Sequence, residues 1–343
     1  MKRYSYAIGA LLGILLAALA IVLITVRAGE IPRVVSVWPL FAALGVSVVT
    51  WWLQGLIVAV LAQPHLKSLR VSDMGRVYMA GAFVWGISPI KGAEVPFQGY
   101  LLKQFGLSTG EASTVVVTRV LLDVVVLTPP ALGGLGHTFG IPKVEHVPVL
   151  LAASIVTGLI AATILLIRKR GRGKLGSTKL SPSESGWRAR GWAKISFFGD
   201  MQRSLALLWH PGYRATLIYG GALTVVYWVF RLSLGPLALM AAGWSGDWLP
   251  VFVTQLLLFS LVLPLAPTPG GSGVRELGFA ALMTASVPEG QLLSGTIVYT
   301  GLTHYLPVIV GAFFFGRQLW KESPAMIRAG IKRQRAYSRD ANA

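Results

Sequence analysis

The chain has 343 residues, of which 54% are hydrophobic and only 13% are charged. Soluble globular domains carry about 25% charged residues, and a water-soluble fold could not bury so much apolar surface. The composition therefore excludes a soluble protein and indicates one that lies in a membrane. Cysteine is absent, which excludes disulfides, thiolate catalysis and metal sites that depend on cysteine.

Basic residues greatly outnumber acidic ones, with 31 Lys and Arg against 13 Asp and Glu. They lie mainly between the apolar runs, where they act as topology signals, and no nucleic-acid recognition module is visible. We therefore expect membrane lipids rather than nucleic acid as partners, and neither a cofactor nor a metal.

Six stretches are long and apolar enough for a helix to cross the hydrocarbon core, which takes about 20 residues. They are residues 4–26, 37–62, 111–133, 147–167, 215–241 and 291–316. The first is too long for the apolar part of a signal peptide, so we expect an uncleaved helix. The sequence predicts one all-helical, polytopic membrane domain over residues 1–320, followed by a basic tail at 321–343.

The distribution of basic residues predicts the orientation. Basic clusters lie at the N-terminus, around Lys67 and Arg76, at residues 168–213, and in the tail. By the positive-inside rule these regions are cytoplasmic, which places both termini on the cytoplasmic side of the cell (inner) membrane. We expect residues 168–213 to be a flexible topology determinant, with a site for anionic lipid or a partner as the alternative.

Two apolar stretches are too short or too broken to cross. Residues 76–90 are interrupted at Pro89, and residues 249–266 run into a turn rich in proline and glycine. To keep the basic regions on one side, residues 76–110 and 249–288 must each enter and leave through the same face. We predict two re-entrant helical hairpins entering from opposite faces, as in inverted repeats whose broken helices meet near the midplane.

The tips of these hairpins are the richest candidate binding sites. At the second tip, prolines end one half-helix, glycines permit unusual backbone conformations, and a new helix starts near Ser272 or Gly273. Free amides at that helix start, together with Arg275, would seat an anion such as phosphate. The first tip offers a similar pattern, although an ordinary cytoplasmic loop is the alternative there. The candidate residues of the two tips are Lys91, Glu94, Pro269, Gly270, Gly271, Gly273, Arg275 and Glu276.

Other candidates are charged or titratable residues inside apolar runs, where a charge costs from about 3 to over 10 kcal/mol. Arg119 and Asp123 stand four apart on one helix face and can pair, either lining a cavity or only fixing helix packing. Arg231 has no acid nearby in sequence, so another helix or a ligand must supply its counter-charge, unless it snorkels. His304 faces either a packed neighbour or the same cavity.

Three stretches resemble the lysylphosphatidylglycerol synthase transmembrane family, also called the flippase-like group. They are residues 92–123, 267–276 and 304–311, with PTPGG-x-G-x-x-E the most specific part. The resemblance covers essentially the whole chain and implies a domain that moves or presents lipids, without the soluble transferase domain of some members. The chain departs from the family pattern where Ala93 precedes Glu94, and at Thr300, where many members have arginine.

We predict a flippase-like lipid translocase that binds an anionic or phosphate-bearing headgroup in a polar intramembrane cavity. A phospholipid or a polyprenyl phosphate would fit this description. We expect a transporter rather than an enzyme, because no Asp-x-Asp motif, histidine cluster or donor-binding domain is visible. The alternatives are an integral membrane lipid transferase, or a scaffold for a glycosyltransferase or other lipid-modifying partner.

Overall fold

The computed structural model describes residues 33–65, 70–88, 92–139, 211–266, 268–284 and 286–316. Within these ranges every regular element is helical. The predicted spans at 4–26 and 147–167 lie outside the described residues, as do Lys91, the tail and nearly all of the basic segment.

Four helices of the described residues are long and apolar enough to cross a membrane. They are Val37–Ala62, Thr109–Ala131, Tyr213–Ala241 and Glu289–Gly316, and they coincide with four of the predicted spans. They belong to α2 (Val37–Ala62), α5 (Thr109–Phe139), α8 (Pro211–Ala241) and α12 (Glu289–Thr300) with its continuation. The prediction of a polytopic helical membrane protein is confirmed.

The first broken unit consists of α3 (Val71–Ile87) and α4 (Glu94–Gln104), which pack on each other and, through α4, on α5. Helix α3 begins five residues before the predicted start at residue 76. The earlier start puts Asp73 in the first turn, where the positive end of the helix dipole favours an acidic side chain.

The second broken unit repeats the order of α3, α4 and α5, in which a helix is followed by a break, a short helix and a long helix. Its first helix contains a π turn, in which hydrogen bonds skip one extra residue, and α12 continues through another. The elements in order are α9 (Trp248–Leu257), η1 (Leu258–Val262), α10 (Leu263–Leu265), η2 (Pro269–Gly271), α11 (Val274–Met283), α12 and η3 (Gly301–Tyr305). Such π turns are frequent at functional sites.

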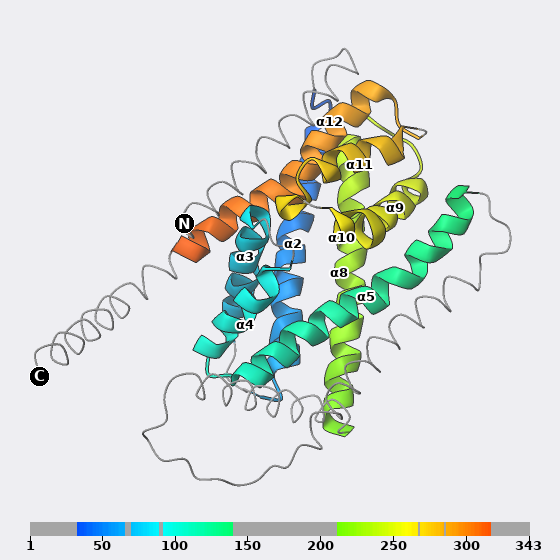
Figure 1. Ribbon diagram of the computed structural model, residues 1–343. Helices are drawn as coiled ribbons and strands as arrows, with labels where there is room; N and C mark the ends of the chain where they lie inside the picture. The colour runs from blue at the N-terminus through cyan, green and yellow to red at the C-terminus, as the bar shows by residue number, and fades with distance from the viewer. Residues whose placement is uncertain are drawn as a thin grey trace, which may run out of the picture.

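The second unit meets the first where η2 lies against α3, and Figure 1 shows this region (yellow) beside the end of α3 (cyan). The two breaks in the helices are thus brought toward each other in the molecule. The re-entrant placement of both hairpins and their inverted orientation in the membrane stay predictions.

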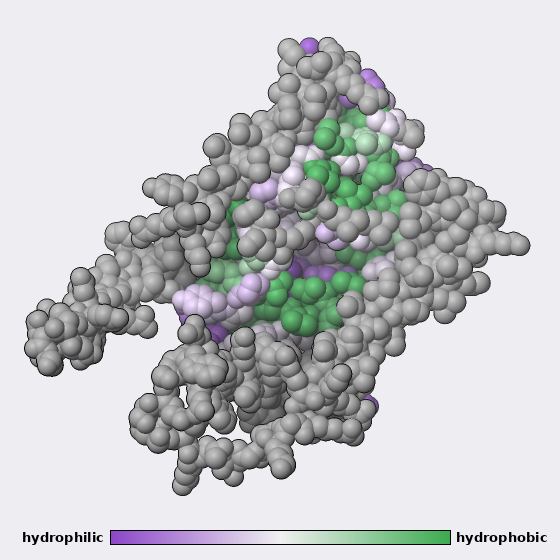
Figure 2. Space-filling model, viewed as in Figure 1, coloured by the Kyte–Doolittle hydropathy of each residue, from purple (hydrophilic) through white to green (hydrophobic). Residues whose placement is uncertain are grey.

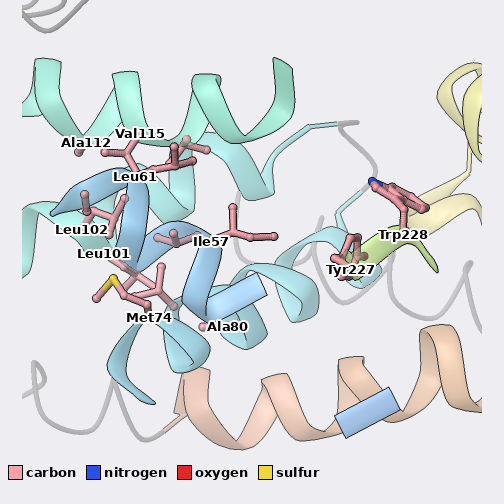
Figure 3. Packing of buried hydrophobic residues seen from close by; sticks show 14 of the residues in the cluster. Ile57, Leu61, Met74, Ala80, Leu101, Leu102, Ala112, Val115, Tyr227 and Trp228 are labelled. Atoms are coloured by element: carbon pink, nitrogen blue, oxygen red, sulfur yellow. The ribbon is translucent and has the colours of Figure 1, made fainter. Parts of the chain in front are cut away.

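Two apolar clusters form the interior. One joins α2, α3, α4 and α5 with parts of α8 and α9, and Figure 3 shows Leu61 of α2 near Leu102 and Val115. The other joins α8 to α12 and contains Phe279. Helix α2 packs along α8 and connects the two clusters.

Many large apolar side chains point outward, as expected of a surface that faces lipid tails. Trp38 is 78% exposed and Ile218 is 70% exposed. On the face seen in Figure 2, the described residues form apolar patches on either side of a recessed polar region. Several buried polar and charged side chains lie in and after η2, among them Ser272, Arg275 and Glu276.

Candidate functional site

The chain reverses at η2 through glycines with left-handed backbone angles. Gly270, Gly271 and Gly273 have φ of 57°, 73° and 80°. A Cβ added at Gly270 would lie 2.5 Å from Cε1 of His304 and 3.1 Å from Cα of Gly86. Only glycine satisfies both the angle and the space, so the tip is wedged between the end of α3 and η3.

Arg275 follows this tip in the first turn of α11 and its side chain is fully buried, with 0% exposure. Its Nη2 donates a hydrogen bond to the carbonyl oxygen of Gly270 at 2.6 Å. The guanidinium lies over the ring of Trp85, 4.8 Å from its centroid. Nε and Nη1 have no hydrogen-bond partner among the described residues, so two nitrogens, which carry three N–H groups, remain for a ligand.

Glu276 is also fully buried, and both carboxylate oxygens accept hydrogen bonds. Oε2 accepts from the backbone N–H of Gly273 at 2.7 Å, and Oε1 accepts from the hydroxyl of Tyr305 at 3.0 Å. The carboxylate thus caps the amide of Gly273 at the start of α11. The predicted anion seat at the amides of this helix start stays a prediction.

Arg231 of α8 enters the same region and is 9% exposed. Its Nη2 donates to the carbonyl oxygen of Thr303, in the π turn η3, at 3.0 Å. Its guanidinium lies 5.4 Å from the ring centroid of Phe259, in the π turn η1. Both π turns thus contact this arginine, which is internal and does not snorkel. Among the described residues it forms no ion pair with a carboxylate.

His304 packs against neighbouring side chains beside the tip, and its predicted place in a cavity stays a prediction. The residue is 2% exposed and its ring meets Trp85 edge-on at 5.1 Å. Nε2 lies 3.4 Å from the hydroxyl oxygen of Ser272. Nδ1 is buried without a hydrogen-bond partner among the described residues.

The region around η2 is therefore rich in hydrogen-bond donors and poor in acceptors. Tyr299, stacked on Phe279 at 4.3 Å, has an unpartnered hydroxyl and lies within electrostatic range of Arg231 and Arg275. Each buried polar group without a partner costs about 1 to 3 kcal/mol. Among the described residues, the unpartnered atoms that can donate are Arg275 Nε and Nη1, Arg231 Nε, Tyr299 Oη and Thr268 Oγ1, and Nδ1 of His304 is unpartnered as well.

Arg119 and Asp123 form a second cluster, in which charges are paired. Nη2 of Arg119 lies 3.6 Å from Oδ2 of Asp123, and its Nη1 donates to Oε1 of Gln98 at 2.9 Å. Oδ1 of Asp123 accepts from the indole N–H of Trp228 at 2.9 Å. The predicted pair is thus real. Trp228 also contacts Phe259, with ring centroids 5.3 Å apart, which connects this cluster to Arg231.

The structure thus brings the candidates of the second tip together with Arg231 and His304, and keeps Arg119 and Asp123 in a neighbouring cluster. Glu94 lies in the first turn of α4. The sequence analysis did not identify several aromatic and polar residues that contact these side chains. Among them only Tyr305 is adjacent in sequence to a predicted site residue, His304. The missed partners are Trp85, Gln98, Trp228, Phe259, Tyr299 and Tyr305.

Comparison with known families gives a match over most of the chain. The family model of the lysylphosphatidylglycerol synthase transmembrane region matches residues 10–311, a stretch that includes both broken units and the donor-rich tip. No curated protein matches the chain at a significant level. The extent of the family match shows that this multi-pass membrane protein belongs to the lysylphosphatidylglycerol synthase transmembrane family.

Proposed function

We propose that the protein is a lipid translocase that holds an anionic, phosphate-bearing headgroup at η2 while the lipid tails stay in the bilayer. The observation that carries the proposal is the set of buried donors without partners around Arg275. A phosphate group presents several acceptor oxygens and negative charge. It would therefore satisfy donors that have no partner among the described residues.

The charge balance supports the same ligand. Arg275 and Arg231 bring two positive charges into an apolar interior, and Glu276 brings one negative charge that is bound by Gly273 and Tyr305. The excess positive charge is costly in a membrane interior. An anionic headgroup would remove it, and the planar guanidinium fork suits the two-point binding of phosphate.

A close contact at the tip would have to open for a headgroup to pass there. Gly270 leaves no space for a side chain against Gly86 of α3 or His304 of η3. Passage of a headgroup on that side would therefore require η2 and α3 to separate. The ring of Trp228 contacts Phe259 and its indole N–H donates to Asp123, so the surroundings of Arg231 adjoin the Arg119 and Asp123 pair.

A reconstitution assay tests the proposal directly. Vesicles containing the purified protein would receive fluorescent phosphatidylglycerol or phosphatidylcholine in both leaflets, and dithionite would report exchange of the label between leaflets. We expect faster exchange of phosphatidylglycerol, lost in the Arg275→Gln variant. Chemical conversion of the lipid would instead indicate a transferase, and binding without exchange would indicate a protein that only presents lipid to a partner.

The topology on which this proposal depends has its own test. Because the chain has no cysteine, single cysteines can be introduced without removing others. A cysteine at Ser183 is expected to be shielded from an impermeant thiol reagent outside intact cells, whereas one at Ser286 is expected to react. Labelling of both positions from one side would contradict the two-hairpin arrangement.

A further inference from the structure

The hydrogen bonds around Ser272 decide which nitrogen of His304 carries hydrogen. The single hydroxyl hydrogen of Ser272 is used on the carbonyl oxygen of Pro269, 2.8 Å away. Toward Nε2 of His304, at 3.4 Å, Ser272 can then only accept. Nε2 is therefore the protonated nitrogen of the neutral ring, and the lone pair lies on Nδ1.

Nδ1 of His304 carries a lone pair and can accept a proton within the donor-rich region. It is buried without a hydrogen-bond partner among the described residues. In the neutral ring Nε2 already carries a hydrogen, so a further proton can be accepted only at Nδ1. The site therefore contains an imidazole, the side chain whose unperturbed charge change lies nearest to physiological pH, beside two arginines that stay charged.

The charged and titratable groups around the ring come from few elements. Arg275 of α11 and Arg231 of α8 act on His304 electrostatically, and both repel a third positive charge. Glu276 accepts a hydrogen bond from Tyr305, the residue that follows His304. Tyr299 lies within electrostatic range of Glu276 and both arginines. Helix α3 presents the ring of Trp85, and α2, which contacts η3, contains no ionisable side chain.

We propose that the site binds its anionic headgroup together with one proton, which His304 takes up from solvent at Nδ1. This inference rests on the proposed function. A phosphodiester anion cancels the excess charge of the two arginines, so an imidazolium is tolerated once the headgroup is bound. Its new N–H donates to a phosphate oxygen. Binding of lipid and proton are then linked, each raising the affinity for the other, and lipid movement responds to a proton gradient.

Calorimetry measures this linkage without any variant. Dihexanoyl phosphatidylglycerol would be titrated into the detergent-solubilised protein in two buffers with different ionisation enthalpies, at several pH values between 6 and 8. A phosphodiester does not titrate in this range, so any proton taken up enters the protein. We expect uptake approaching about one proton per lipid, and an affinity that rises up to about tenfold for each pH unit lowered.

Matched histidine variants assign the proton. In His304→Gln the side-chain amide still has a donor for Ser272 but no titrating nitrogen, so we expect binding with no proton uptake and no pH dependence. His304→Asn serves as a second variant if the first does not fold. His65→Gln, a matched change beside Glu111 at the end of α2, is expected to leave the proton count unchanged.

The outcomes separate the inference from the proposed function. Lipid binding without proton uptake in the unaltered protein overturns the inference and leaves the proposed function standing. Proton uptake that persists in both folded His304 variants also overturns it, because the proton then enters another group. Absence of lipid binding at every pH overturns the proposed function and the inference together.

Discussion

Two regions of the molecule differ in how their charges are paired. On α5, Nη2 of Arg119 lies 3.6 Å from Oδ2 of Asp123, although Nε of Arg119 has no hydrogen-bond partner among the described residues. Around η2, Arg275 forms no ion pair with a carboxylate of the described residues, and two of its nitrogens are buried without hydrogen-bond partners there. The first region therefore contains an ion-paired arginine, and the second contains a buried arginine without an ion-pair partner among the described residues.

This difference separates stability from ligand binding. Breaking a buried ion pair leaves one charge uncompensated and destabilises the fold. Removing a buried cation that has no carboxylate partner leaves no such charge, so we expect a smaller effect on the stability of the empty protein. Substitutions in the first region are thus expected to act mainly on folding. Substitutions in the second region are expected to act mainly on lipid binding.

The largest effect on binding is expected from Arg275→Gln. Two charge-assisted hydrogen bonds to a headgroup, each contributing about 1.5 to 3 kcal/mol, correspond to at least about a hundredfold loss of affinity for phosphatidylglycerol by calorimetry. The thermal midpoint of the lipid-free variant is expected to stay level or rise, because Glu276 keeps Gly273 and Tyr305. A variant that binds lipid normally but unfolds earlier would show that Arg275 is structural.

Arg231 is expected to have the next largest effect on binding. Arg231→Leu is expected to abolish most lipid exchange, while Arg231→Lys retains part of it, because lysine keeps the charge but loses the planar fork. The loss of one charge-assisted hydrogen bond corresponds to about a ten- to hundredfold loss of affinity for the lipid. Since Arg231 bonds to the carbonyl of Thr303 rather than to an acid, removing Asp123 as well should not rescue stability. A fully active Arg231→Leu variant would refute this role.

The paired region is expected to respond to Arg119→Leu mainly through folding. Breaking a fully buried pair costs about 3 to 5 kcal/mol, and we expect about 2 to 3 kcal/mol here because the Asp123 side chain is 19% exposed and keeps its bond to Trp228. Equilibrium unfolding measures the loss. The Arg119→Leu, Asp123→Leu double variant should recover most of it, and a double variant as unstable as the single one would mean that the pair is not the cause.

The smallest expected effect compares one glycine from each break. Gly92 and Gly270 both have positive φ, of 76° and 57°, so alanine strains each by about 1 to 2 kcal/mol. A Cβ at Gly92 meets nothing within 4 Å, whereas at Gly270 it meets His304. Both variants should lose stability through the backbone angle, Gly270→Ala more because of the clash, and only Gly270→Ala should also weaken lipid binding. Equal binding losses would contradict the placement of the site at η2.

The sequence alone determined the class, four of the described helices and the position of both breaks. These features are local: the length of an apolar run, and the effect of proline and glycine on the backbone, depend on neighbouring residues. The choice of Arg275 and Glu276 followed from the same local pattern at the second tip. The start of α3 was wrong by five residues, because no strong signal marks that boundary.

Only the tertiary structure decided which charges have partners. Glu276 meets Tyr305 across 29 residues, and Arg231 meets Thr303 across 72. Arg275 lies over Trp85, which comes from the other broken unit. The sequence showed that Arg231 lacked an acid nearby but not that its partner is a carbonyl in a π turn. Such pairings depend on how separate helices cross and rotate, and helix-by-helix patterns carry no information about that geometry.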